Sequence, residues 1–197
     1  MARGHRKILD LGCGTGRHTL YLAQCSIGDC PSVVGLSPSP EVWGVDTSEV
    51  ALQITREKAT KLGLDINLQQ QDMRSLSFAD DSFDALLCIW TTGHGLLTDL
   101  QQSVAEMRRV LHPGGLLVAD FCSTDDETYG VGETLEEHTF VGGRPGEEEI
   151  PHHYSTLAEL QQLFASFATT KIEPVDYTYQ IGNDPHLIKA FLVQAEK

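Results

Sequence analysis

Apolar residues along the chain gather into short runs separated by longer amphipathic stretches. Five runs of closely spaced apolar side chains predict buried strands: 7–11, 41–46, 66–70, 83–90 and 116–121. Helices are expected in three of the stretches between them: 16–25, 47–62 and 98–110. Strands that alternate with helices are typical of a parallel sheet covered on both faces. The pattern therefore predicts the α/β class with a three-layer sandwich architecture.

The last part of the chain adds one helix and two strand-like runs. We expect the helix near 155–167, with Ser155 or Thr156 as its N-terminal cap. The strand-like runs cover 171–180 and 186–195. The sheet should therefore gain two further strands after the long segment 122–154.

Length and composition fit one compact domain. With 197 residues, of which 41% are hydrophobic, the chain has the usual size of a domain and enough apolar residues for one core. We therefore expect a single domain over residues 1–197. No apolar stretch is long enough to span a bilayer, and no secretory pattern opens the chain. These features predict a cytoplasmic protein that does not associate with membranes.

The cysteines argue against both a disulfide framework and a zinc site. They are odd in number and lack paired C-x-x-C spacing: Cys13, Cys25, Cys30, Cys88 and Cys122. We therefore predict no metal site.

The net charge of −14 argues against a nucleic-acid partner, since binding to a phosphate backbone needs a basic surface that releases counterions. The 14 lysines and arginines are scattered along the chain. A small-molecule partner is favoured, protein substrates stay open, and a monomer or a homodimer fits equally well.

The most informative motif lies at the end of the first predicted strand. Ile8, Leu9 and Leu11 form the apolar strand, and the glycines of Gly12-Cys13-Gly14-Thr15-Gly16 let the backbone turn and approach a ligand closely. The G-x-G-x-G spacing, with Asp10 two residues ahead, differs from the G-x-G-x-x-G dinucleotide fingerprint. The motif resembles motif I of class I S-adenosylmethionine (SAM) methyltransferases.

Four further segments resemble the later motifs of the same family, in the same order. They are Glu41–Asp46, Ile66–Met73, Asp81–Trp90 and Arg109–Phe121, the last of which contains a Pro-Gly-Gly turn. The resemblance covers residues 7–121 and is nearest to small-molecule methyltransferases of the tellurite-resistance type. It implies a Rossmann-like, mostly parallel seven-stranded sheet whose antiparallel last strand is inserted between the fifth and the sixth.

The resemblance also implies SAM as the cofactor and S-adenosylhomocysteine as the product. In the family the acid after the second strand, here Asp46, holds the ribose hydroxyls. The acid after the third strand, Asp72, accepts from the adenine amino group while Met73 packs on the ring. Alternatively, Asp46 is a solvated acid that caps a helix. The implied cofactor-binding residues are Asp10, Gly12, Cys13, Gly14, Gly16, Asp46, Thr47, Asp72, Met73 and Trp90.

Two departures from the family pattern concern access to the pocket. The first strand begins a few residues after Met1, so the N-terminal helices common in the family are expected to be missing. Residues 25–40 are rich in Pro, Ser and Gly and predict a flexible surface insertion. We expect a truncated or variant form whose pocket is more open than that of its relatives.

Candidate acceptor-binding residues lie after the fourth and fifth strands, because ligands bind beyond the carboxyl ends of strands in open α/β sheets. His94, in the turn after the fourth strand, is a candidate general base or orienting donor; alternatively it is a turn histidine bonded to backbone. The segment 122–154 resembles the insertion that covers substrate in small-molecule methyltransferases. It holds nine acids and the single base Arg144, and we interpret its 147–149 acidic run as solvated.

The end of this segment contributes three more candidate catalytic residues, His152, His153 and Tyr154. They could supply a base, a pair of metal ligands or aromatic walls. Adjacent residues of an extended segment point in opposite directions, so only one of the two histidines is expected to face the pocket.

These features predict a SAM-dependent methyltransferase that acts on a small molecule by in-line displacement at the methyl carbon. Two alternatives stay open. A truncated or non-catalytic protein with a SAM-binding fold and an interaction role is favoured by the short N-terminus. A nicotinamide-dependent oxidoreductase is disfavoured by the glycine spacing.

Overall fold

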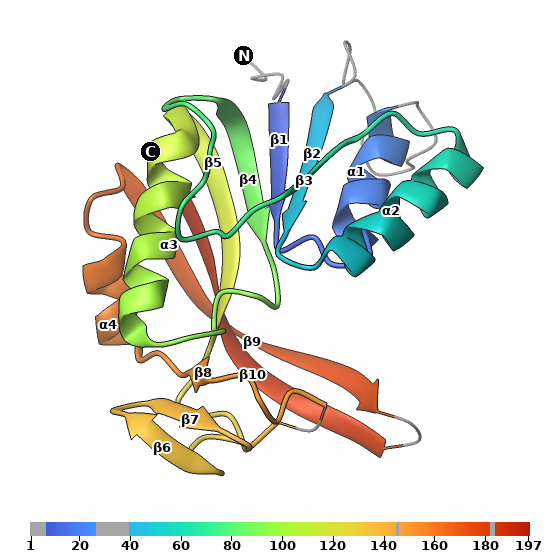
Figure 1. Ribbon diagram of the computed structural model, residues 1–197. Coiled ribbons are helices and arrows are strands. Elements are labelled where there is room, and N and C mark those ends of the chain that lie inside the picture. Colours follow the sequence, from blue (N-terminus) through green and yellow to red (C-terminus); the bar gives the residue numbers. More distant parts are fainter. Residues whose placement is uncertain (1–6, 27–39, 145, 182–183) are drawn as a thin grey trace.

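The computed structural model describes residues 7–26, 40–144, 146–181 and 184–197. Its main sheet has seven strands in the order β3-β2-β1-β4-β5-β10-β9 (Figure 1). The strands are β1 (Lys7–Leu11), β2 (Glu41–Asp46), β3 (Asn67–Gln70), β4 (Phe83–Cys88), β5 (Leu111–Cys122), β9 (Thr169–Ile181) and β10 (Asp184–Glu196). All neighbours from β3 to β5 pair in parallel, and β10 is antiparallel to both β5 and β9. This arrangement confirms the predicted α/β sandwich with its inserted last strand.

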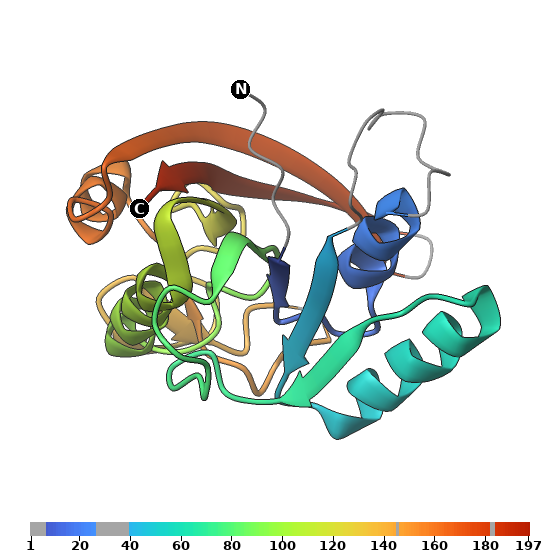
Figure 2. The ribbon, with the colours of Figure 1, turned by 90° about the horizontal axis from the view of Figure 1, so that it is seen from above.

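Four helices cover the sheet, and Figure 2 shows them in two layers. One face carries α1 (Arg17–Ser26) and α2 (Glu49–Leu62), and the other carries α3 (Leu97–Val110) and α4 (Leu157–Leu163). Buried apolar side chains of α3 and α4 pack on β4, β5 and β10, and directly after α4 the ring of Phe164 contacts that of Phe121 edge to face, with 5.6 Å between ring centroids. The largest part of the core therefore lies between β5 and the α3–α4 layer.

The local signals that predicted α2 operate as expected. The Ser48 hydroxyl accepts a hydrogen bond from the amide of Ala51, which caps the N-terminus. Gly63 ends the helix in the left-handed conformation with φ +65°. Because the cap residue lies two positions after Asp46, the start of α2 is fixed close to the end of β2.

Two elements differ most in length from the predictions, β5 and α4. Strand β5 begins at Leu111, directly after α3. Leu111 already pairs with Phe83 of β4, and after the Pro-Gly-Gly turn Leu116 pairs with Ala85. The turn is thus an irregularity within the strand and not its start. Helix α4 is shorter than 155–167, with Thr156 as its cap. Phe164 and Phe167 follow it as buried side chains.

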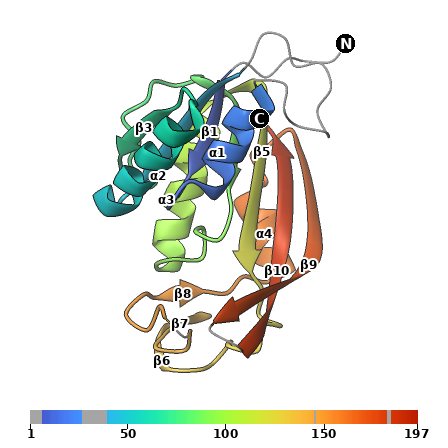
Figure 3. The same ribbon diagram turned by 90° about the vertical axis from the view of Figure 1, so that its right-hand side faces the viewer.

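The segment 122–154 is not a simple loop. It contains a second sheet of three short strands, β6 (Glu133–Glu136), β7 (Thr139–Val141) and β8 (His152–His153), in the order β6-β7-β8 (Figure 3). This sheet lies beyond the carboxyl end of β5. The predicted insertion at 25–40 falls for the most part on 27–39, which lie outside the described residues.

None of the four helices in the described part of the chain has the length and hydrophobicity that a membrane crossing requires.

Asp10, at the end of β1, is almost fully buried and accepts a hydrogen bond of 2.6 Å from the Thr19 hydroxyl in α1. Burial raises the pKa of Asp10 to about 6, and the bond from Thr19 opposes this shift. A carboxyl whose pKa is higher in the folded state than in the unfolded state favours folding when it is protonated. Its contribution is therefore present at low pH and lost as the pH rises through 6.

This linkage predicts how Asp10→Asn changes stability. Asparagine keeps an acceptor oxygen for Thr19 but does not titrate. Between about pH 4 and pH 7.5 the free energy of unfolding of the variant should rise relative to the parent chain by about 2–3 kcal/mol. Urea unfolding at a series of pH values measures this difference. Parallel pH profiles for the two proteins would contradict it, and the exposed Asp65→Asn serves as the control.

Candidate functional site

The glycine loop after β1 is held tightly against its neighbours. The amides of Gly12 and Cys13 both donate to the Val45 carbonyl in β2, at 2.8 and 3.0 Å. Gly12 has φ +72°, and a Cβ built there would lie 2.4 Å from the Thr91 side chain. Gly14, with φ +52°, donates its amide to a carboxylate oxygen of Asp46 at 2.8 Å. Glycine is thus required at position 12 both for its conformation and for the close approach of the turn after β4.

Asp46 connects this loop to the start of α2. One carboxylate oxygen accepts from Gly14, and the other accepts from the Ser48 amide at 2.8 Å. Each oxygen has a second lone pair, so the side chain can still accept from a ligand. If Asp46 were only a helix-capping acid, this would explain the hydrogen bond from Ser48. It would not explain the hydrogen bond from Gly14 in the glycine loop.

A first cavity of about 430 Å³ opens beyond the carboxyl ends of β1, β2 and β3. It is lined by the glycine loop, the ends of β2 and β3, the turn after β4 and the first turns of α3. Its walls include Gly12, Gly14, Val45, Asp46, Thr47, Gln71, Asp72, Met73, Arg74, Trp90, Thr91, His94 and Asp99. Such a position at the carboxyl edge is where open α/β sheets bind their ligands.

One wall of the first cavity is a chain of ion pairs. Arg74 donates to both carboxylate oxygens of Asp72 and reaches Asp99 at 2.7 Å. The hydrogen bonds from Arg74 lower the pKa of both Asp72 and Asp99 below the ordinary value. Asp72 is therefore ionised and its side chain is held in a fixed orientation.

The turn after β4 separates the first cavity from a second one. Trp90 has φ +63° and donates its amide to the Asp120 carboxylate at 2.8 Å, while the Thr92 hydroxyl donates to the main-chain oxygen of Asp120. Burial raises the pKa of Asp120 to about 6. The Arg17 guanidinium lies over the Trp90 ring at 5.0 Å. These contacts hold the unusual backbone of the turn in place.

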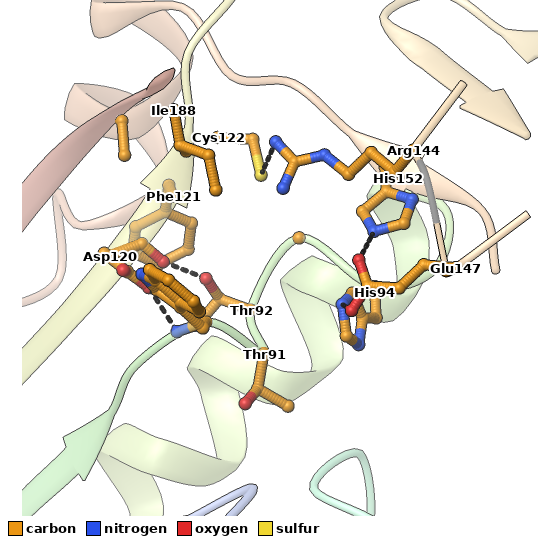
Figure 4. A pocket seen from close by; sticks show the side chains of 14 residues that line it. Thr91, Thr92, His94, Asp120, Phe121, Cys122, Arg144, Glu147, His152 and Ile188 are labelled. Carbon is orange, nitrogen blue, oxygen red and sulfur yellow. Dashed lines mark hydrogen bonds and ion pairs between the residues drawn. The ribbon is translucent and has the colours of Figure 1, made fainter. Parts of the chain in front are cut away.

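The second cavity, of about 320 Å³, lies between this turn, the end of β5, β10 and the segment that precedes β8 (Figure 4). Its walls are formed by Trp90, Thr91, Thr92, Gly93, His94, Asp120, Phe121, Cys122, Arg144, Gly146, Glu147, His152, Ile188 and Ala190. Trp90, Thr91 and His94 line both cavities. The two cavities therefore adjoin at the turn after β4.

Three side chains form a polar cluster in the second cavity: His94, Glu147 and His152 (Figure 4). His152 Nε2 lies 2.9 Å from Glu147 Oε2, and His94 Nε2 lies 3.8 Å from Glu147 Oε1. Burial is the main cause that lowers the pKa of His94, and the nearby His152 adds to it. The hydrogen bond with His152 lowers the pKa of Glu147. At neutral pH the cluster thus presents a neutral imidazole and a carboxylate. Their donor atoms could also hold a metal ion, since all lie within 4.8 Å of one another.

Arg144 is a largely buried cation whose side chain, 11% exposed, extends along the second cavity toward Cys122 (Figure 4). It lies 3.3 Å from Cys122 Sγ, and its contacts with oxygen are long: 3.4 Å to the Tyr154 hydroxyl and 3.7 Å to an oxygen of Asp126. The Asp126 carboxylate already accepts from the amides of Thr128 and Lys189. The guanidinium therefore has donor capacity left for a ligand in the cavity.

The structure brings most of the predicted cofactor-binding residues together. Those that line the first cavity are Gly12, Gly14, Asp46, Thr47, Asp72, Met73 and Trp90. Asp10, Cys13 and Gly16 do not line it. They are part of the loop's support, since Asp10 and Cys13 are buried and a Cβ at Gly16 would collide with Thr55 at 2.6 Å.

The four predicted catalytic residues divide into two pairs. His94 and His152 line the second cavity, whereas His153 and Tyr154 do not. His153 points the other way, toward Thr139 and Glu159, each at 2.8 Å. Tyr154 is buried, bonds the Thr128 hydroxyl at 2.7 Å and lies beneath Arg144. The expectation that only one of the adjacent histidines faces the pocket matches this placement.

Among the residues of the second cavity that sequence reasoning missed are Glu147 and Arg144, whose charges matter most for its chemistry. Glu147 was interpreted as part of a solvated acidic run, yet it lies between the two histidines, and Arg144 was noted only as the single base of its segment. No local pattern marks either position. The charge contrast of one arginine among nine acids was the only available signal for Arg144.

Comparison with known proteins agrees with this architecture. A family model described as "Methyltransferase domain" matches residues 8–115. Demethylmenaquinone methyltransferase of Staphylococcus aureus (strain JH9) is 36% identical over 114 residues, which are 57% of this chain and 41% of that protein. The chain thus aligns with about two fifths of the length of the curated relatives that it matches.

Solved structures share the fold at low sequence identity. A SAM-dependent methyltransferase from Methanosarcina mazei superposes with a TM-score of 0.77 at 23% identity, over 99% of this chain and 93% of the other. TehB from Haemophilus influenzae gives 0.67 at 16% identity, over 100% of this chain and 58% of the other. The family match covers more than half of the chain and confirms the resemblance seen in the sequence. The chain therefore belongs to the methyltransferase domain family, with the Rossmann-like fold of SAM-dependent members.

Proposed function

We propose that this protein is a SAM-dependent methyltransferase that binds its cofactor in the first cavity and a small-molecule acceptor in the second. The observation that carries the proposal is the junction of the two cavities at Trp90, Thr91 and His94. A methyl donor in the first cavity and a methyl acceptor in the second would come into contact at this turn. Holding two reactants in line in this way can supply about 7–11 kcal/mol of the barrier reduction.

The residues of the first cavity suit the chemistry of an adenosyl sulfonium. Asp46 would accept from the vicinal ribose hydroxyls with its remaining lone pairs. Met73 offers a polarizable surface to the adenine ring. Asp72, ionised and oriented by Arg74, would accept from the adenine amino group. The amides and small residues of the glycine loop let the amino acid portion approach the backbone.

SAM carries its methyl group on a positively charged sulfur atom. When the methyl group is transferred, this sulfur is a good leaving group because it becomes a neutral thioether. The protein has to orient the acceptor, exclude water and take up a proton where the acceptor is not already an anion. His94, neutral at neutral pH and located in both cavities, is placed to do this. His152 and Glu147 orient it from the second cavity.

Only part of the second cavity comes from the segment that the family model matches. The family match ends at residue 115, whereas Asp120, Cys122, Arg144, Glu147 and His152 of the second cavity all come later. The demethylmenaquinone in the name of the Staphylococcus aureus relatives does not carry over to this chain, because the alignment covers only 41% of those proteins. The cavity volume of about 320 Å³ and the buried Arg144 favour a small acceptor with an anionic or electron-rich group.

A turnover assay with tritiated SAM and a panel of thiols, metalloid oxyanions, phenols and amines tests the proposal. We expect transfer to at least one anionic or phenolic acceptor, with S-adenosylhomocysteine as the other product. Binding of S-adenosylhomocysteine without transfer to any member of the panel would instead favour the non-catalytic SAM-binding interpretation.

Replacement of Asp46 by alanine should weaken binding of S-adenosylhomocysteine by about 1.5–3 kcal/mol, since hydrogen bonds to a charged group are lost. Isothermal titration calorimetry of the variant and the parent chain gives the difference directly. Asp65→Ala, at an exposed position outside both cavities, is the matched control. Equal affinities for the parent chain and Asp46→Ala would refute the ribose assignment.

Replacement of Arg144 by glutamine should raise the KM of an anionic acceptor found in the panel by about 10–100-fold, because a charge-assisted contact is removed. Affinity for S-adenosylhomocysteine should stay unchanged, since Arg144 does not line the first cavity. Steady-state kinetics with the acceptor varied provides the measurement. A change in cofactor affinity with the acceptor KM unaffected would place Arg144 outside the acceptor site.

A further inference from the structure

We propose that His94, Glu147 and His152 bind one divalent transition-metal ion in the second cavity, and that this ion holds the anionic oxygen or sulfur atom of the methyl acceptor. The metal site stands on the geometry of these three residues. Its role toward the acceptor rests on the proposed function.

The donor atoms lie close enough together to share one metal ion, since all are within 4.8 Å of one another. Four ligands at about 2.1 Å around a tetrahedral zinc ion lie about 3.4 Å from one another. The two contacts between histidine nitrogens and Glu147 oxygens, 2.9 and 3.8 Å, bracket this value. Each histidine faces a different oxygen of the same carboxylate, and all three side chains converge within 4.8 Å. A small shift of the Glu147 side chain would equalise the distances.

The backbone holds the two histidines in position before any ion binds. His94 and His152 form an isolated antiparallel bridge between the turn after β4 and strand β8. Next to it, the Gly95 amide donates to the Pro151 carbonyl at 2.9 Å, and the His153 amide donates to the Gly93 carbonyl at 2.8 Å. The two imidazole rings pack edge to face with centroids 5.0 Å apart. A preformed site lowers the cost of ordering ligands around the ion.

The cavity leaves space for an exogenous ligand. Cys122 and the Arg144 side chain that extends toward it line the cavity next to the cluster (Figure 4), and Trp90 and Thr91 also line the first cavity. Three protein ligands and an open fourth position are the arrangement of catalytic rather than structural zinc sites.

Charge also favours an anion at that position. The carboxylate of Glu147 neutralises one of the two positive charges of a divalent ion, and the histidines are neutral ligands. The remaining charge and the Arg144 guanidinium would both attract a negatively charged donor atom. Two imidazoles and one carboxylate suit zinc, cobalt(II), manganese(II) or iron(II), and we take zinc as the primary candidate.

The transfer balances in atoms and charge. With one ring nitrogen bound to the ion, His94 would no longer take up a proton, and the acceptor hydroxyl or thiol would release its proton to solvent on binding to the ion. A lone pair of the bound oxygen or sulfur then forms the bond to the methyl carbon, and the carbon–sulfur bond of SAM breaks with its electron pair left on sulfur. The products are the methylated acceptor and S-adenosylhomocysteine, and the metal is neither oxidised nor reduced.

Calorimetric titration of the chelator-treated chain with zinc chloride tests the site without any assay of activity. We expect one ion per chain with micromolar or tighter affinity, weakened by about 100-fold or more in Glu147→Gln and His94→Ala. His112→Ala, on an exposed part of β5, is the matched control and should bind like the parent chain. Glu147 is 40% exposed, so its conservative replacement should leave the fold intact, as thermal unfolding checks.

Cobalt(II) absorption identifies the ligands. The proposed site should give weak d–d bands without a strong cobalt–thiolate band, and Cys122→Ser should leave the spectrum unchanged. Absence of stoichiometric binding, or equal affinity in the parent chain and Glu147→Gln, overturns the metal site. A cobalt–thiolate band that Cys122→Ser removes overturns the ligand set.

Two further results separate this inference from the proposed function. Stoichiometric zinc binding by a chain that transfers no methyl group supports the site while the proposed function fails. Methyl transfer that survives removal of the metal and the Glu147→Gln replacement overturns the role of the ion toward the acceptor while the proposed function holds.

Discussion

The carboxylate of Asp46 fixes the arrangement on which the rest of the site depends. It joins the glycine loop after β1 to the start of α2 through Gly14 and Ser48. The same loop brings Gly12 so close to Thr91 that a Cβ at that position would collide with its side chain. The turn after β4 therefore packs directly on the end of β1. Trp90 and His94, on that turn, come to lie between the two cavities.

The second cavity depends on contacts between segments that are far apart in sequence. Strand β8 docks on the turn after β4 through the pairing of His94 with His152 and the bond from the His153 amide to Gly93. This docking carries the preceding segment, with Arg144 and Glu147, over the end of β5. The part of the chain that the family model matches thus lines the first cavity and contributes the turn after β4, and the part after it supplies the rest of the second cavity.

The sequence predicted what local patterns encode. Strand runs and the glycine motif each depend on residues a few positions apart, so the strands and the residues around Asp46 were accessible, and the order of the sheet followed from the family resemblance. Glu147 bonds His152, and its place in the cavity follows from the pairing of His152 with His94, a contact between distant parts of the chain that no local pattern records. The early start of β5 was missed for a similar reason, because the pairing of Leu111 with Phe83 extends the strand across a Pro-Gly-Gly turn.

A crystal structure of the chain with S-adenosylhomocysteine tests the central claim most directly, namely that two adjoining cavities separate cofactor from acceptor. The account predicts the ribose hydroxyls on Asp46, the adenine ring against Met73 and the sulfur atom directed at Trp90, Thr91 and the second cavity. A ligand bound in the second cavity, or a sulfur atom directed away from the turn after β4, would contradict it.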